Sequence, residues 1–416
     1  MTFFSKNLTG AILAFSLSAA ALAAPKENAS DSWLVQQINK HPDIVAAKET
    51  MKAVFSQAQG SKKALYNPEL VTGYEREGNT NNFEIGFSQK IDWWDKREAR
   101  EQQANFSLTQ VSKYFSSLQQ VKISQALQAL ISYKASKEQA TIANEQEQQL
   151  TTLLEIVEQR QQTGDLGQVD AELTYLSLSR ILNNTALAQV TLKQAVVRVK
   201  ELLPDWTADR KVLPAQGMVI NTDNVSQLMQ QEWLNTHPAV LTAKAQWQVS
   251  KAQAQVVLLN TKTEPTFGVR AGKVGQDTLI GLDFSMPLNI RNDFSEQARA
   301  ANQFANAAES TYRSVFRQQK FAIQASQETL LSYQKNYLRW VKLMQGRGKR
   351  SEDLLAKQWQ SGDMSTTQYL LALQQRAAGL SAGIELKSQY RLSQIDWLLQ
   401  VGQLGQTSQA IKQLSH

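Results

Sequence analysis

Side chains that could catalyse a reaction or bind a metal ion are scarce in this sequence of 416 residues. It contains no cysteine and only three histidines, one of which is the last residue. His41 and His237 each precede a proline, which could reflect a pair of metal ligands or simply two helix openings, because proline suits the first helical turn. We favour the helix openings. Since no phosphate-binding glycine loop or zinc-ligand spacing is found either, the sequence predicts no enzyme, no metal site and no cofactor.

The remaining candidates for chemistry are charged residues beside two Gly-Asp turns, at 163–167 and 361–365. These residues are Arg160, Asp165, Asp170 and Asp363. The carboxylates have two interpretations: they cap the helices that follow, or, repeated by symmetry, they form rings that favour cations and hold a constriction. In the second case Arg160 would pair with one of them across the turn, and the four residues would form a gate.

The sequence is duplicated at an offset of about 197 residues. His41-Pro42-Asp43-Ile44-Val45-Ala46-Ala47-Lys48 corresponds to His237-Pro238-Ala239-Val240-Leu241-Thr242-Ala243-Lys244. Such internal repeats define the architecture and are therefore sought first.

Each half contains one predicted β-hairpin, at 68–90 and at 265–288. Apolar residues alternate with small or polar residues in both, which predicts strands with one apolar and one polar face. Polar loops are expected at 75–82 and 273–278. The residues predicted on the apolar face are Leu70, Tyr74, Phe83, Ile85, Phe87, Phe267, Val269, Ile280, Leu282 and Phe284.

The rest of each half is predicted to be helical. A helix over about 97–163 has neither proline nor glycine and would be about 100 Å long. Its counterpart at 293–361 should break near Gly346-Arg347-Gly348. Return helices are expected at 168–203 and 366–399, and shorter helices precede each hairpin. Each half therefore reads helix, two strands, long helix, turn, helix, and the helices must pack as a coiled-coil bundle.

The predicted domains follow from this pattern. Residues 1–23 resemble a signal peptide with cleavage after Ala23, so we expect export. The first repeat spans 24–203, a linker 204–224, the second repeat 225–404 and a tail 405–416. The net charge of +7 is spread among acidic residues along the helices, which argues against a nucleic-acid partner.

Two short hairpins are too small to form a stable isolated sheet. In a bilayer only helices and closed barrels satisfy all backbone groups. Four strands cannot enclose a usable lumen, but a trimer would supply twelve. The alternative is a soluble periplasmic coiled-coil or adaptor-like protein in which the hairpins cap a helical bundle.

The ordered set of motifs resembles the TolC-like outer membrane factors over nearly the whole mature chain. The set consists of the duplication, the strand entry Asn67-Pro68-Glu69-Leu70, the two Gly-Asp turns and an ending with Ile395-Asp396-Trp397-Leu398. The resemblance implies a mainly α-helical homotrimer, with a helical tunnel in the periplasm and a twelve-stranded barrel in contact with outer membrane lipid. It implies passive export, together with a periplasmic adaptor and an inner-membrane pump of the RND type.

The resemblance also implies that a periplasmic adaptor contacts the turns, at Gly164, Asp165, Leu166, Gly362, Asp363 and Met364. After the second turn this sequence has Gln368 and Tyr369 where some members carry acidic residues. The stretch Lys96-Arg97-Glu98-Ala99-Arg100 is similar to the branch that serves heavy-metal pumps, although a basic cluster at this place is more typical of an interfacial anchor.

Overall fold

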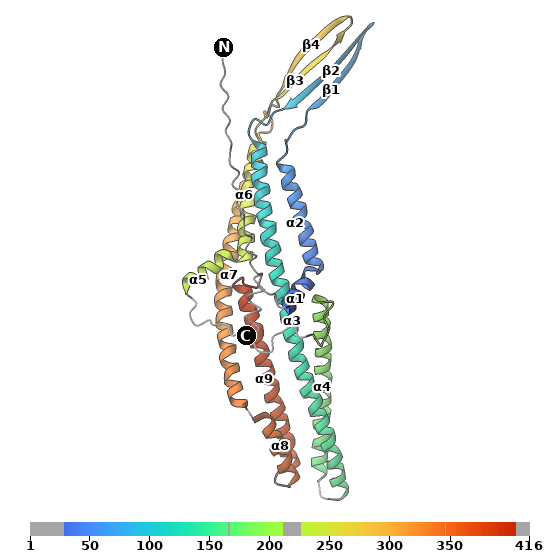
Figure 1. Ribbon diagram of the computed structural model, residues 1–416, viewed down its shortest axis with the longest axis vertical. Helices are drawn as coiled ribbons and strands as arrows, with labels where there is room; N and C mark the ends of the chain where they lie inside the picture. The colour runs from blue at the N-terminus through green and yellow to red at the C-terminus, as the bar shows by residue number, and fades with distance from the viewer. Residues whose placement is uncertain (1–28, 165–166, 211–225, 346, 405–416) are drawn as a thin grey trace, which may run out of the picture.

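The computed structural model describes residues 29–164, 167–210, 226–345 and 347–404. The expected signal peptide, Asp165, Leu166, most of the expected linker and the tail lie outside these residues. The described chain is elongated, with a four-stranded sheet at one end and two helical hairpins at the other (Figure 1). The elements are α1 (Ala29–Asn39), α2 (Pro42–Ser61), β1 (Glu69–Glu77), β2 (Thr80–Lys90), α3 (Lys96–Gln162), α4 (Gln168–Leu202), α5 (Gln227–Thr236), α6 (Pro238–Asn260), β3 (Thr266–Val274), β4 (Asp277–Ser285), α7 (Ser295–Met344), α8 (Arg347–Gln360) and α9 (Thr366–Gln400).

The His-Pro pairs open helices, as predicted. His41 is the N-cap of α2 and His237 is the N-cap of α6. In each case the Nδ1 atom accepts a hydrogen bond from the backbone N–H two residues later, at 3.2 Å. Among the described residues, no group of three or more acidic or histidine side chains could hold a metal ion.

The long helices follow the predicted order. Helix α3 has 67 residues without interruption, whereas its counterpart is divided into α7 and α8. The division falls at Gln345, where the backbone leaves the helical region, next to the glycine pair at which the break was expected. None of the helices in the described ranges is long and apolar enough to cross a membrane.

The two hairpins pair with each other to form one antiparallel sheet in the order β1-β2-β3-β4. The prediction of loops at 75–82 and 273–278 is wrong, because the strands continue to two-residue turns at Gly78-Asn79 and Gly275-Gln276. Gly78 and Gly275 have φ values of 60° and 64°. A glycine with positive φ in the first position of a two-residue turn matches the twist of antiparallel strands, so pairing can extend to the very end. The second hairpin also ends at Ser285 rather than at 288.

Two clusters of buried side chains hold the helices together. The larger lies where α1, α3, α4, α7 and α9 meet, and includes Leu34, Ile123 and Ile395. The smaller lies near the helical tips and includes Leu153, Val157, Trp359 and Leu370.

Helices α7 and α9 approach closely at Trp340 and Gly383. A Cβ atom at Gly383 would overlap the indole ring of Trp340. Tyr337 stacks on Trp340 with ring centroids 6.5 Å apart and on Tyr390 at 5.6 Å. The missing side chain at Gly383 therefore makes room for an aromatic stack that joins the two helices.

We predict that Gly383→Ala lowers the free energy of unfolding by about 1–3 kcal/mol, since the indole ring must move. Gly379→Ala is the matched control: it lies one turn away in α9, and a Cβ there meets no atom within 4 Å. The control should be neutral or stabilising by up to about 1 kcal/mol, because alanine favours helix. Unfolding of the purified protein followed by circular dichroism measures both, and equal effects would contradict the close-packing argument.

Candidate functional site: the sheet faces and the helical tips

The strand register places all ten predicted apolar residues on one face of the sheet. Leu70 pairs with Phe87, Phe87 with Val269, and Val269 with Leu282. Paired residues share a face, and residues two positions away along each strand join them there. The other members follow from the same register: Tyr74, Phe83, Ile85, Phe267, Ile280 and Phe284. We call this the apolar face.

The apolar face is exposed in the single chain. Ile280 is 81% exposed and Leu282 is 83% exposed. Tyr74 and Phe83 pair near the turns, and Phe267 and Phe284 pair near the helices. These two pairs are six residues apart along the strands, so the apolar band between them is roughly 20 Å tall. Aromatic side chains at both margins of such a band are typical of membrane-spanning strands.

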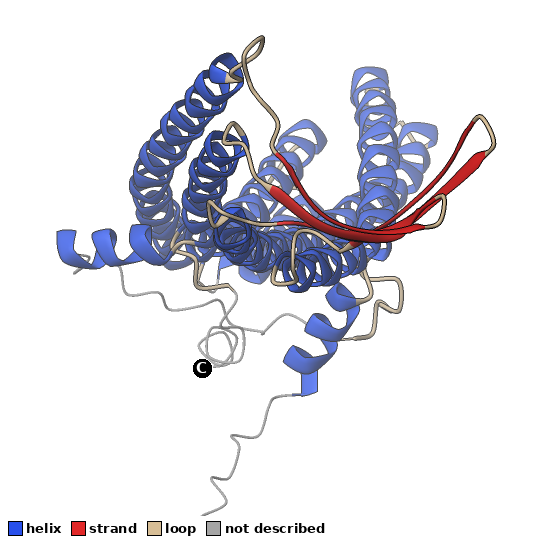
Figure 2. Ribbon diagram, turned by 90° about the horizontal axis from the view of Figure 1, so that it is seen from above, coloured by secondary structure: helices blue, strands red, loops and turns tan. Residues whose placement is uncertain are grey.

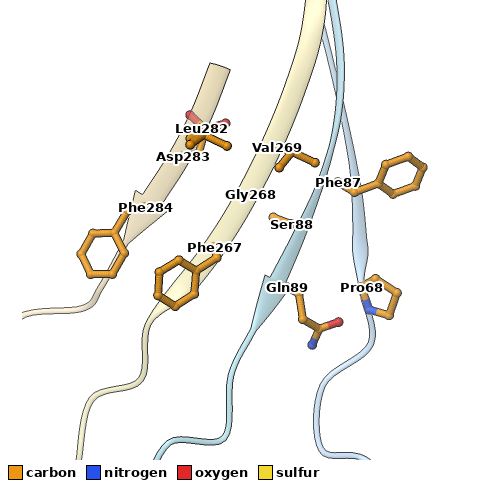
Figure 3. A pocket seen from close by; sticks show the side chains of 10 residues that line it. All are labelled: Pro68, Phe87, Ser88, Gln89, Phe267, Gly268, Val269, Leu282, Asp283 and Phe284. Carbon is orange, nitrogen blue, oxygen red and sulfur yellow. The ribbon is translucent and has the colours of Figure 1, made fainter. Parts of the chain in front are cut away.

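A shallow hollow of about 640 Å³ lies at the helix-proximal end of the apolar face. Phe267 and Phe284 lie side by side at one margin, with ring centroids 5.3 Å apart, and Phe87 points away at the other (Figure 3). Pro68 closes the hollow below Phe87. Apart from Ser88, Gln89 and Asp283, the residues that line this hollow have no polar side chain, so its chemistry fits hydrocarbon better than a polar ligand.

The opposite face, called here the polar face, carries the carboxylates of the sheet. They are Glu69, Glu75, Glu77, Glu84, Asp277 and Asp283, against the two cations Lys90 and Arg270. Arg270 lies between two of the carboxylates: its Nη1 is 3.4 Å from Glu84 and its Nε is 3.5 Å from Asp283.

The sheet bends toward the polar face. Cβ atoms added at Gly86 and Gly272 would overlap the carbonyl oxygens of Val269 and Phe83 on the neighbouring strands. Such crowding occurs where strands converge on the inner side of a curve. Figure 2 shows the curved sheet as seen down the long axis of the molecule. The polar face is therefore the concave side.

Where the sheet meets the helices, the chain buries a charged cluster around Glu264, which is 1% exposed. The Tyr66 hydroxyl donates a hydrogen bond to Glu264 Oε2, and the Nζ atoms of Lys96 and Lys90 lie 3.3 and 3.5 Å from the same oxygen. Lys96 Nζ also donates to the Lys262 carbonyl at 2.7 Å. Burial and the hydrogen bond to Glu264 raise the pKa of Tyr66 to about 12.

This cluster corrects one interpretation of the sequence and supplies residues that the sequence did not indicate. Lys96 is not an exposed interfacial anchor, because it is 5% exposed and forms an ion pair with Glu264. Glu264 was missed because a single glutamate before Pro265 has no distinguishing spacing, and its partners all come from the other repeat. Arg97 is exposed, and its backbone N–H is bound by the Asp92 side chain at 2.9 Å.

At the opposite end, glycines terminate the helices as predicted. Gly164 and Gly362 have φ values of 80° and 83° beyond α3 and α8. Ser365 caps α9, and Gln368 completes a reciprocal capping box with it. Asp363 accepts a hydrogen bond from Ser361 at 2.8 Å, whereas the N-cap of α4 is Gly167, which has no side chain to cap the helix. Gly164, Gly362, Asp363 and Met364 thus lie at the tips, while Asp165 and Leu166 are outside the described residues.

The two tip hairpins are joined by Trp359, which is 5% exposed. Arg160 of α3 lies over the indole ring at 5.3 Å, and Tyr369 of α9 stacks on it at 5.1 Å. A second link connects α9 with α4, since Thr367 donates to Asp170 at 2.8 Å. Of the four expected gate residues, Arg160 and Asp170 therefore join the hairpins, but through Trp359 and Thr367 rather than through each other. Pairing of Arg160 with Asp165 lies outside the described residues.

Trp359 and Tyr369 explain the departure noted after the second turn. Gln368 completes the capping box of α9 with Ser365, and Tyr369 stacks on Trp359. Sequence reasoning missed Trp359 because it treated the tip as a charged site. The available signal was a tryptophan at the next-to-last position of a mostly polar helix.

We predict that Glu264→Gln lowers the free energy of unfolding by about 3–5 kcal/mol, because Lys96 then remains buried without its counter-charge. In a Lys96→Met background the same substitution should cost at least about 2 kcal/mol less. Denaturant unfolding of the four proteins in this cycle measures the coupling. Equal costs in the two backgrounds would show that the ion pair does not anchor the junction.

Comparison with known proteins identifies the family that these features resemble. Residues 33–204 match the model of a family described as outer membrane efflux protein. Members of that family are channels rather than enzymes, in agreement with the lack of a catalytic constellation in the sequence. Comparison with curated protein sequences gave no match.

Solved structures of channels are similar over almost the whole chain. The Campylobacter jejuni CmeC outer membrane channel is 14% identical, with 99% of this chain and 98% of that chain covered and a TM-score of 0.74. CusC is 13% identical, with 92% and 95% covered and a TM-score of 0.74. The Neisseria gonorrhoeae MtrE channel is 13% identical, with 90% and 88% covered and a TM-score of 0.72. The chain therefore has the TolC-like fold in both repeats, and its first repeat matches the outer membrane efflux protein family in sequence, which confirms the resemblance.

Proposed function

We propose that this protein is the outer membrane exit duct of an efflux system, active as a homotrimer. The observation that carries the proposal is the apolar face: ten large apolar side chains lie exposed on one side of a sheet that continues into long helices, of which α3 is about 100 Å long. Burying this face in lipid removes it from water, and the helical body then extends into the periplasm. The polar face lines the lumen.

The two unpaired edges of the sheet are evidence for an assembly of three copies. Strands β1 and β4 each have one neighbour, so each has an edge with unpaired backbone groups. Such edges are not tolerated in a bilayer. Pairing β4 of one chain with β1 of the next closes a barrel, and three chains supply the twelve strands that a lumen requires.

The helices offer a second surface for the same assembly. Exposed apolar residues of α4 recur at intervals of three, four, seven or eleven, which are compatible with the spacing of a coiled-coil seam. They are Val169, Leu173, Leu176, Leu187, Val190 and Val197. Packing against a neighbouring copy would bury this stripe.

The helical tips would meet a periplasmic adaptor, through Gly164, Asp165, Leu166, Gly362, Asp363 and Met364. The duct conducts passively, and an inner-membrane pump of the RND type supplies the energy. At rest, the Trp359 contacts and the Asp170–Thr367 hydrogen bond hold the tip hairpins together within each chain. Docking of the adaptor separates them and opens the tunnel.

The proposed location is the outer membrane, with the helices in the periplasm and the signal peptide removed. A soluble coiled-coil protein is the rival. It would leave the apolar face in contact with water, at a large free-energy cost.

We predict that Leu282→Arg prevents barrel assembly, since a cation on the lipid face costs about 2–4 kcal/mol at the bilayer midplane. Leu279→Arg is the matched control, because Leu279 is in the same strand but belongs to the polar face. The amount of heat-modifiable trimer in outer membrane fractions measures how much of each variant assembles. Normal assembly of the Leu282→Arg protein, or an equal loss in the control, would argue against the lipid-facing assignment.

The absence of cysteine allows the orientation to be tested directly. We predict that Asn79→Cys, in the β1–β2 turn, reacts in intact cells with a membrane-impermeant maleimide too large for the tunnel. Thr163→Cys, at the tip, should react only after the outer membrane is permeabilised. If neither variant reacts until permeabilisation, the soluble periplasmic alternative is correct.

A further inference from the structure

The apolar face carries two charged residues within the described sheet, and both are cations near the turns. Lys273 lies in the same cross-strand row as Tyr74 and Phe83. Arg76 lies on the same face, two residues beyond Tyr74 toward the β1–β2 turn. Every carboxylate of the four strands is on the polar face instead. Negative charge in the strands is therefore confined to the polar face, and the cations of the apolar face are confined to the end near the turns.

Both cations are exposed and have no carboxylate partner among the described residues. Arg76 Nε donates to the Gly78 carbonyl at 3.3 Å, which holds the guanidinium at the level of the turn. By contrast, Arg270 on the polar face contacts two carboxylates. The two cations of the apolar face thus present positive charge that the protein does not neutralise.

The position of these cations along the strands indicates what could neutralise their charge. They lie above the band of apolar side chains, at the margin marked by Tyr74 and Phe83. In a bilayer this margin meets the headgroups, where basic side chains are attracted to anionic lipids. Arg76 and Lys273 are on β1 and β3, so Phe83 of β2 lies between them and offers an apolar surface for acyl chains.

We propose that Arg76 and Lys273 bind the phosphate groups of an anionic lipid in the outer leaflet. This inference rests on the proposed barrel and its orientation, and it adds a lipid partner that the efflux function does not require. The binding surface occurs once per chain, so a trimer has three. Each cation near an anionic surface contributes about fivefold to binding, and the pair about 25-fold.

The test uses the purified trimer in neutral detergent, with native mass spectrometry to count bound lipid. The probes are lipid A, an acylated glucosamine disaccharide with two phosphates, and the same lipid with both phosphates removed. The wild-type protein should bind the phosphorylated form at least about tenfold more tightly. Arg76→Gln combined with Lys273→Gln should abolish this preference.

Lys244→Gln combined with Lys251→Gln is the control: it removes the same charge from exposed positions of α6, far from the sheet. The control should keep the wild-type preference. Loss of preference in the control as well, equal binding of the two lipids by the wild type, or an unchanged preference in the Arg76/Lys273 variant would overturn the proposal. Displacement of bound lipid by inorganic phosphate alone at millimolar concentration would also overturn it, since the surface would then be a phosphate site.

Failure of the barrel itself gives a different result. A chain that is monomeric and needs no detergent refutes the proposed function before any lipid is added. A trimer that inserts in membranes but shows no phosphate preference refutes only the lipid proposal.

Discussion

The pairing register of the four strands is the constraint on which the rest of the sheet depends. A slip of one residue between β2 and β3 would move Phe267, Val269 and their neighbours to the side of the carboxylates. The observed register keeps the ten residues of the apolar face on the side away from the carboxylates across all three pairings, although β2 and β3 are separated by more than 170 residues of sequence. Turns of two residues at both hairpin ends fix the register locally, and the Arg270 contacts to β2 and β4 hold it across the polar face.

The junction beneath the sheet solves a different problem. Strands with an apolar outer face must continue into helices that are exposed to water, and four connections cross this boundary. Glu264 binds Tyr66 in the connection before β1, Lys90 at the end of β2 and Lys96 at the start of α3. Nearby, Trp94 donates to the Thr263 carbonyl and Asn289 to the Thr261 carbonyl. Contacts between the repeats, made by Glu264 and Trp94, and one within the second repeat, made by Asn289, thus fix the sheet on the helices.

Much of this architecture could be predicted from the sequence because its signals are local. Alternation in the strands predicted the apolar face, and the offset between the repeats aligned the two hairpins. Helix ends followed from glycine at 164 and 362 and from proline after His41 and His237. What could not be predicted depends on contacts between distant residues. Glu264 and Trp359 acquire their roles from partners on other elements, and the tight turns were obscured because polar residues at 75–82 continue as strand.

The link between the tip hairpins has a consequence for how the two repeats can evolve. Asp170 and Thr367 are 197 residues apart, whereas Gly164 and Gly362 of the two turns are 198 apart, as are the first residues of α4 and α9. By this local offset Asp170 corresponds to Gln368, and Thr367 corresponds to Val169. Two identical repeats would carry the same residue at 169 and 367, either valine or threonine. Fusion of the two copies into one chain removes that restriction, so one half keeps a hydroxyl donor where the other half has an apolar side chain.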